Sequence, residues 1–160
     1  MKESKKPVIN FLLKWRFVIA VLFAAAILFV EGCGKGESPT EDLYQKYFET
    51  NVLNSDFVVS RATDNGSDLT GQYDGWVFRL LKNTYYDGPM TAVKNGNTYT
   101  GTWSSNQDYG KLTINITLPS VPGEIVFLNR EWRFTKKDLP TMELAPWAST
   151  APIVLHMRRL

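Results

Sequence analysis

The chain has 160 residues with 18 basic and 16 acidic side chains, one histidine and one cysteine, and its formal net charge is +2. A single cysteine excludes an intramolecular disulfide and a multi-cysteine metal site, and a single histidine excludes a histidine-rich zinc site. Five of the basic residues and two of the acidic ones lie in residues 1–32, so residues 33–160 carry 13 basic and 14 acidic side chains. The basic excess belongs to the N-terminus and gives no reason to expect a nucleic-acid partner.

The N-terminal segment has the pattern of an export signal. Basic residues predominate from Lys2 to Arg16, and the 14 residues Phe17–Val30 follow without a charge or a hydrogen-bonding side chain. A basic lead and an apolar run of roughly 7–15 residues are typical of a secretory signal peptide, whereas a membrane-spanning helix needs about 20 apolar residues. We therefore predict a signal peptide over residues 1–32, with an uncleaved anchor helix as the alternative.

The residues Val30-Glu31-Gly32-Cys33 resemble the lipobox of bacterial lipoproteins, in which an aliphatic residue and two small residues precede an acylated cysteine. Glu31 differs from the small residue usual at its position. The resemblance implies that Cys33 receives a thioether-linked diacylglycerol and becomes the new N-terminus. Two acyl chains anchor a protein stably where one holds it weakly. We expect the membrane as a partner through lipid on Cys33, a location in the bacterial cell envelope at the outer membrane, and a tether over residues 33–37.

The run Ser38-Pro39-Thr40-Glu41 predicts the start of a helix, because serine caps, proline suits the first helical position and the glutamate completes a capping box. We expect this helix over residues 38–51. Leu43, Tyr47 and Phe48 form its expected apolar stripe, and Gln45 belongs to the expected polar side.

After Asp56 the apolar residues recur with the period of two that is typical of strands. Lys111–Leu118 alternates most regularly, and Asn95-Gly96 is a strong signal for a type I′ hairpin turn. Short strands without room for crossover helices predict an antiparallel sandwich or barrel, and continuous short turns favour the barrel. Asp87–Pro89 is expected to be a loop. The expected strands are 57–61, 76–81, 90–94, 97–103, 111–118, 125–128, 132–136, 142–144 and 153–159.

In four segments, the spacing of glycine and tryptophan residues resembles that of a known family. The segments are Thr70–Phe78, Val93–Gly96, Gly101–Ser104 and Leu128–Trp132. The family is that of the lipocalin-like lipoproteins of Bacteroidota-type bacteria, small exported calycin-like barrels. The resemblance implies a mainly β domain over residues 38–160, an antiparallel up-and-down β-barrel of about eight strands with one short N-terminal helix. It also implies a cation packed over an aromatic ring at the closed end of the barrel, for which Arg158 or Arg159 is the candidate. The lipocalin Gly-x-Trp signature opens the first strand, whereas here the pattern stands in mid-chain at Gly101–Trp103.

Aromatic residues on the inward-facing positions of the expected strands are the candidate ligand contacts. Core packing is the ordinary role of such residues, and a ligand cage is the alternative. An eight-stranded barrel is just wide enough to be filled by side chains or to hold one small ligand. The candidate cavity-lining residues are Trp76, Phe78, Tyr99, Trp103, Trp132 and Phe134.

Catalytic and metal-binding patterns are weak in this sequence. His156 has no nucleophile–base motif around it and is expected on the outer surface. Asp64, Asp68 and Asp74 are better explained by turn chemistry than by a calcium loop.

These patterns favour a lipoprotein without enzymatic activity, catalytic residues, metal or cofactor, which binds a small apolar ligand in its barrel. The alternative is a structural or protein-interaction module of the envelope with a filled barrel. The cavity volume separates the two, because a ligand pocket needs roughly 300 Å³ or more.

Overall fold

The computed structural model describes residues 39–136 and 140–160, so the predicted signal peptide, Cys33, the tether and Ser38 lie outside the described residues. Within the described ranges no helix combines the length and the apolar character needed to cross a membrane. The elements are α2 (Pro39–Asn51), β1 (Asp56–Asp64), β2 (Ser67–Asp68), the 3-10 helix η1 (Thr70–Tyr73), β3 (Val77–Leu80), β4 (Asp87–Lys94), β5 (Asn97–Ser105), β6 (Lys111–Leu118), α3 (Gly123–Leu128), β7 (Glu131–Lys136), β8 (Thr141–Pro146) and β9 (Ile153–Arg159).

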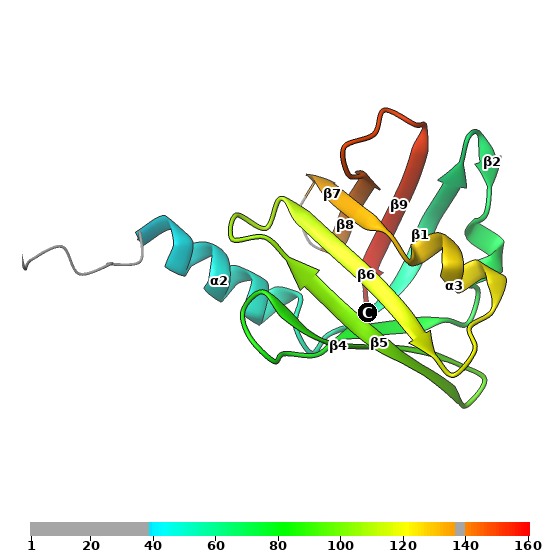
Figure 1. The fold of residues 1–160 in the computed structure, drawn as a ribbon, viewed down its shortest axis with the longest axis horizontal. Helices are drawn as coiled ribbons and strands as arrows, with labels where there is room; N and C mark the ends of the chain where they lie inside the picture. Colours follow the sequence, from blue (N-terminus) through cyan, green and yellow to red (C-terminus); the bar gives the residue numbers. More distant parts are fainter. Residues whose placement is uncertain (1–38, 137–139) are drawn as a thin grey trace, which may run out of the picture. The chain divides into compact units, whose positions relative to one another are not determined.

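Strands β1 and β3 to β9 form a closed antiparallel barrel (Figure 1). Each strand pairs with its neighbour in the chain, and the circle closes where β1 pairs with β9 over seven residue pairs from Phe57↔Arg159 to Asp64↔Ile153. The short strand β2 only extends the end of β1 as a hairpin. The predicted fold class is confirmed as mainly β, a closed eight-strand antiparallel barrel with a short helix on its N-terminal side.

The predicted hairpin at Asn95-Gly96 joins β4 to β5. Both residues have positive φ, 51° and 79°, as a type I′ turn requires. Gly101, further along β5, sits at a register shift between β5 and β6. A Cβ atom there would lie 2.0 Å from the carbonyl oxygen of Asn115, so only glycine allows the two strands to approach this closely.

The pairing between β1 and β3 is the shortest in the barrel, and that between β6 and β7, with three residue pairs, is the next shortest. Only Asp56↔Arg79 and Phe57↔Phe78 pair between β1 and β3. Arg79 Nε donates to Asp56 Oδ1 at 2.7 Å and Nη2 donates to Oδ2 at 2.8 Å. The hydrogen bond from this guanidinium lowers the pKa of Asp56. A bidentate ion pair therefore fixes the register of the two strands where few backbone bonds do so.

Large side chains fill the interior of the barrel. Trp76, Trp103 and Trp132 are 1%, 1% and 0% exposed. The indole Nε1 of Trp103 donates to the carbonyl of Leu81 at 2.7 Å, and that of Trp132 donates to the carbonyl of Leu128 at 3.0 Å. Because main-chain acceptors hold two of the rings, these tryptophans are fixed parts of the core. Other fully buried side chains around them are Phe57, Phe78, Leu80, Met90, Leu112, Ile114, Ile116 and Ile125.

The strand predicted at residues 125–128 is wrong, because this run belongs to helix α3. A four-residue apolar run does not distinguish a strand from a buried helical turn. Ile125, Phe127 and Leu128 are buried, whereas Val126 between them points outward.

Hydrogen bonds hold α3 across the barrel end at which β6 stops pairing with β7. The Tyr73 hydroxyl donates to the carbonyl of Glu124 at 2.7 Å. The Asn129 side chain replaces the missing strand partner of Ile116, since it accepts from the backbone N–H at 2.8 Å and donates to the carbonyl at 2.6 Å. The helix therefore closes a gap in the sheet that a further strand would otherwise have to fill.

The loop predicted at Asp87–Pro89 is also wrong, because these residues begin β4 and pair with Thr102–Ser104 of β5. Proline is tolerated because its carbonyl still accepts from the Leu81 N–H at 2.8 Å. A Cβ atom on Gly88 would lie 1.9 Å from the carbonyl oxygen of Leu81, so glycine permits this close crossing.

The alternation of Lys111–Leu118 predicts that Leu118 lies on the same buried face as Leu112, Ile114 and Ile116, but Leu118 is exposed. It pairs with Thr100 beyond the register shift at Gly101, at the end of β6 that runs past its pairing with β7. The inward positions of β6 are therefore Leu112, Ile114 and Ile116.

We expect Trp132→Ala to lower the free energy of unfolding by about 3–5 kcal/mol, because it removes a large side chain that its neighbours cannot replace. Urea denaturation followed by far-ultraviolet circular dichroism measures the change. Trp147→Ala is the matched control, since Trp147 is 39% exposed. Equal losses in the two variants would contradict the placement of Trp132 in the core.

Candidate functional site

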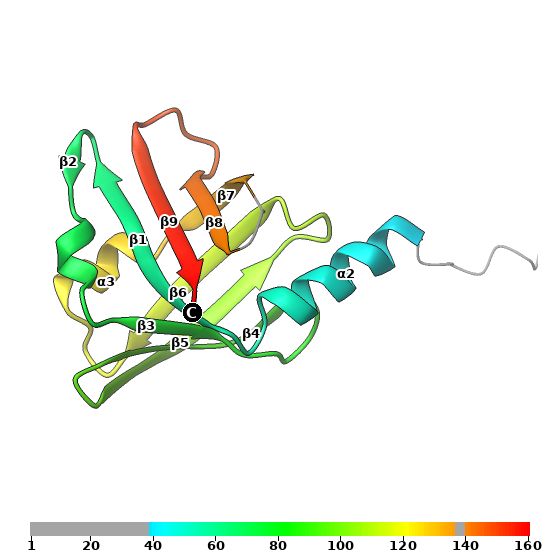
Figure 2. The ribbon, with the colours of Figure 1, turned by 180° about the vertical axis from the view of Figure 1, so that it is seen from behind.

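Helix α2 rests on one end of the barrel through its C-terminal half, and its N-terminal half projects beyond the barrel (Figure 2). The Phe48 ring stacks on Tyr109, with ring centroids 4.5 Å apart, and lies 5.6 Å from Trp103. Gln45 is buried, and its Nε2 donates to the Tyr86 hydroxyl at 2.7 Å. We call this end of the barrel the α2 end. Helix α3 follows the other end of β6 and marks the opposite, α3 end (Figure 1).

The predicted apolar stripe of α2 is wrong in part. Phe48 is buried as expected, whereas Leu43 and Tyr47 are exposed. The buried face consists of Gln45 and Phe48, and Val52 in the turn after the helix continues it at the three- and four-residue spacing of one helix face. A buried glutamine is tolerated here because Tyr86 accepts the hydrogen bond of its amide. Sequence reasoning assigned Gln45 to the polar side from its residue type alone.

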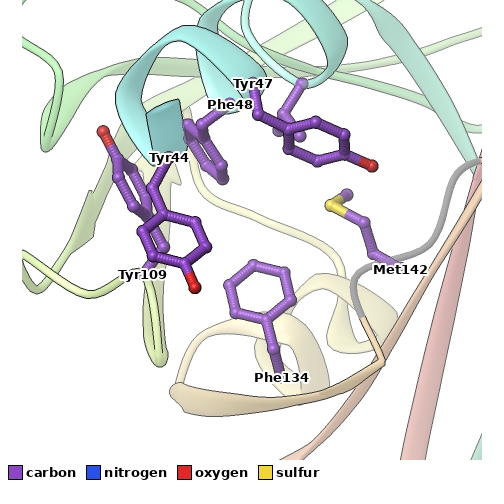
Figure 3. A pocket seen from close by; sticks show the side chains of 7 residues that line it. Tyr44, Tyr47, Phe48, Tyr109, Phe134 and Met142 are labelled. Atoms are coloured by element: carbon purple, nitrogen blue, oxygen red, sulfur yellow. The ribbon is translucent and has the colours of Figure 1, made fainter. Parts of the chain in front are cut away.

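An apolar crevice lies between α2 and the barrel at this end (Figure 3). Its volume is about 30 Å³. Apart from the tyrosine hydroxyls, the side chains around it are apolar, so it can receive an apolar group but offers no acid or base. The lining residues are Tyr44, Tyr47, Phe48, Val52, Tyr109, Phe134 and Met142.

Polar contacts at the C-terminal end of α2 hold the helix side of the crevice in place. Arg159 Nη1 donates to the carbonyl of Asn51 at 3.2 Å. Lys82 pairs with Glu49, and this hydrogen bond raises the pKa of the Lys82 ammonium. On the barrel side, the Tyr109 hydroxyl donates to the carbonyl of Tyr85 at 2.9 Å. The last turns of α2 are thus attached to β9 through Arg159 and to the loop before β4 through Lys82.

The six aromatic candidates from the sequence, all of which are described residues, fall into three groups. Phe134 lines the crevice. Tyr99 is partly buried, with its ring centroid 5.3 Å from that of Trp76. Trp76, Phe78, Trp103 and Trp132 are buried in the barrel interior. The crevice residues that sequence reasoning missed, such as Tyr44, Tyr109 and Met142, come from elements that only the folded chain brings together.

The other candidates are dispersed over the molecule. His156 Nε2 lies 3.9 Å from Glu143 Oε2 on neighbouring strands. Asp68 accepts hydrogen bonds from the Thr70 backbone and hydroxyl, at 2.8 and 2.6 Å, which lower the pKa of Asp68 and hold a turn. Within residues 39–136 and 140–160 no three His, Cys, Asp or Glu side chains gather as metal ligands.

Near the α3 end, the guanidinium of Arg130 lies over two aromatic rings. The guanidinium carbon lies 4.6 Å from the ring centroid of Phe127 and 5.2 Å from that of Trp132. Of the two arginines that the family resemblance singled out, Arg158 is exposed and Arg159 binds the end of α2.

We expect Phe48→Ala to release α2 from the barrel, because this ring contributes the stacked contacts that hold the helix. Hydrogen exchange of the α2 amides should then accelerate while the barrel strands keep their protection. Leu43→Ala is the control on the exposed side and should leave exchange unchanged. Equal α2 protection in Phe48→Ala and the unchanged protein would contradict the assigned docking face.

Comparison with known proteins gives a likeness of fold. No family model matches the sequence, and no curated protein matches it either. The crystal structure of a DUF4847 family protein from Bacteroides vulgatus is similar to this chain with a TM-score of 0.52. The two sequences are 15% identical, and the match covers 69% of this chain and 95% of that chain. At this identity the likeness shows a shared barrel fold alone.

Proposed function

We propose that this chain is a non-enzymatic lipoprotein of the bacterial envelope, anchored through Cys33, whose filled barrel is a rigid module for docking to another envelope protein. The observation that carries the proposal is the packed interior, in which Trp76, Trp103 and Trp132 occupy the place of a ligand. A barrel of this size holds either its own side chains or one small molecule. The outer surface of the barrel is therefore where the partner protein binds in this proposal.

The volume of the crevice supports the same choice. Ligand pockets usually measure about 300–1,000 Å³. The crevice at the α2 end measures about 30 Å³. A docking function needs no such cavity.

The α3 end offers apolar surface for a partner. Leu118 is 65% exposed at the end of β6, and Val126 is 58% exposed on α3, which packs against β6. Apolar side chains at the centre of an interface supply much of its binding energy. We assign the partner-facing surface to this end because α2, which follows Cys33 closely in the chain, lies at the opposite end.

A small apolar ligand at the α2 end is the second candidate, and one observation favours it. The crevice is lined by apolar parts of side chains from α2, β7, β8 and the turn before β6. To admit a ligand, α2 would have to move away from Phe134 and Met142. This candidate is the lipocalin-like function that the family resemblance implies.

A fluorescent fatty-acid probe distinguishes the two candidates. We expect no saturable binding, because the crevice has no room for an alkyl chain. Phe134→Ala, which widens the crevice, is the positive comparison and should bind the probe if access is limited by volume. Saturable binding of one probe molecule to the unchanged protein, abolished by Met142→Trp but not by Trp147→Ala, would support the carrier and overturn the filled module.

The lipid anchor is tested by Cys33→Ala in cells supplied with a labelled fatty acid. We expect the variant to lose the label and to keep the mass of the uncleaved precursor, because the thioether can form only at this cysteine. Glu31→Ala is the matched control, since it restores the small residue usual before the glycine and should be labelled at least as well as the unchanged chain. Labelling that persists in Cys33→Ala would refute the anchor.

A further inference from the structure

We propose that one exposed flank of α2, formed by Leu43, Tyr44 and Tyr47, lies against the surface of the lipid bilayer that holds Cys33. We call these three residues the apolar flank. The inference rests on the proposed lipid anchor and adds to it an orientation, with the α2 end toward the membrane and the α3 end away from it.

The first observation is the division of the exposed surface of α2. Leu43, Tyr44 and Tyr47 are 66%, 54% and 43% exposed, and the two tyrosines also line the crevice with part of their surface. At about 3.6 residues per turn these three fall together on one side of the buried face. The other side carries the charged residues Asp42, Lys46 and Glu49, the last of them paired with Lys82. The helix therefore presents one apolar and one charged flank beside the face that packs on the barrel.

The second observation is the short distance along the chain to the anchor. Residues 34–38 separate Cys33 from the first residue of α2. A fully extended chain spans at most about 3.3–3.6 Å per residue, so α2 begins within about 20 Å of the acylated cysteine. The apolar flank follows in the first turns of the helix, at a rise of about 1.5 Å per residue. The tether thus keeps this flank close to the bilayer in every conformation that it can adopt.

The chemistry of the flank suits the interface between lipid and water. A tyrosine places its ring among the upper acyl chains and its hydroxyl among the headgroups. An interfacial helix buries its apolar face about 5–10 Å into this region. The charges of α2, which are three acidic residues (Glu41, Asp42 and Glu49) against Lys46, give no attraction to anionic lipid. The contact therefore depends on the apolar side chains and forms on a zwitterionic bilayer.

The test is made with the acylated protein in phosphatidylcholine vesicles. A nitroxide is attached to a single introduced cysteine, Tyr47→Cys or Leu43→Cys on the apolar flank, or Lys46→Cys on the charged flank. Cys33 takes no label, because its sulfur is in the thioether. All three positions are exposed, so the variants retain the fold. Electron paramagnetic resonance then compares collision of each nitroxide with oxygen, which is enriched in lipid, and with a nickel complex, which stays in water.

We expect a several-fold higher ratio of oxygen to nickel accessibility at positions 43 and 47 than at position 46. Equal ratios at the three positions would overturn the inference while leaving the anchor intact. Protection from nickel without enrichment in oxygen would mean that protein covers the flank, and would overturn it as well. Labelling of Cys33 in the chain without an introduced cysteine would refute the lipid anchor itself, and the tether would then not hold α2 near the bilayer.

Discussion

Closing a small sheet on itself leaves a space at its centre that the chain must fill, and three indole rings fill it here. Trp76, Trp103 and Trp132 come from the residue before β3 and from β5 and β7, so strands from around the barrel meet on them. Two of the rings donate hydrogen bonds to main-chain carbonyls. These hydrogen bonds fix the orientation of the two rings, and close packing fixes where the rings lie. The barrel around them therefore has little freedom to open.

The two ends of the barrel are finished differently. At the α3 end, the short helix replaces strand pairing that β6 and β7 do not make, and Tyr73, Asn129 and Arg130 hold it. At the α2 end, the longer helix and the turn after it cover the barrel only with Gln45, Phe48 and Val52. The barrel therefore has one closed end and one partly covered end, and the two ends present different surfaces.

This difference between the two ends determines how the proposed function orients the barrel. Under the proposed function, the anchor is assigned to the α2 end, because only residues 34–38 separate Cys33 from the first residue of α2. We propose that the apolar flank of α2 faces lipid and that the exposed residues of the α3 end face a protein partner. A filled barrel suits this arrangement, since it acts as a rigid spacer between the two surfaces.

The proposed ligand-binding site shows how far single-sequence reasoning extends. The inward positions of the strands were predicted, and Trp76, Phe78, Trp103 and Trp132 are buried. Whether buried aromatic rings enclose a cavity or fill it depends on their packing across the barrel, which no local pattern encodes. The crevice at the α2 end is built from four separate elements and has no sequence signature of its own.

The sequence by itself determined the strand periodicity, the Asn95-Gly96 hairpin and the antiparallel β class, because alternation and turn chemistry act over neighbouring residues. It also determined that a helix begins near Pro39. The tertiary structure alone decided that residues 125–128 form a helix, since the gap between β6 and β7 selects that conformation for an ambiguous apolar run. It alone decided which side of α2 is buried, because Phe48 finds Trp103 and Tyr109 only after the distant strands that carry them have closed.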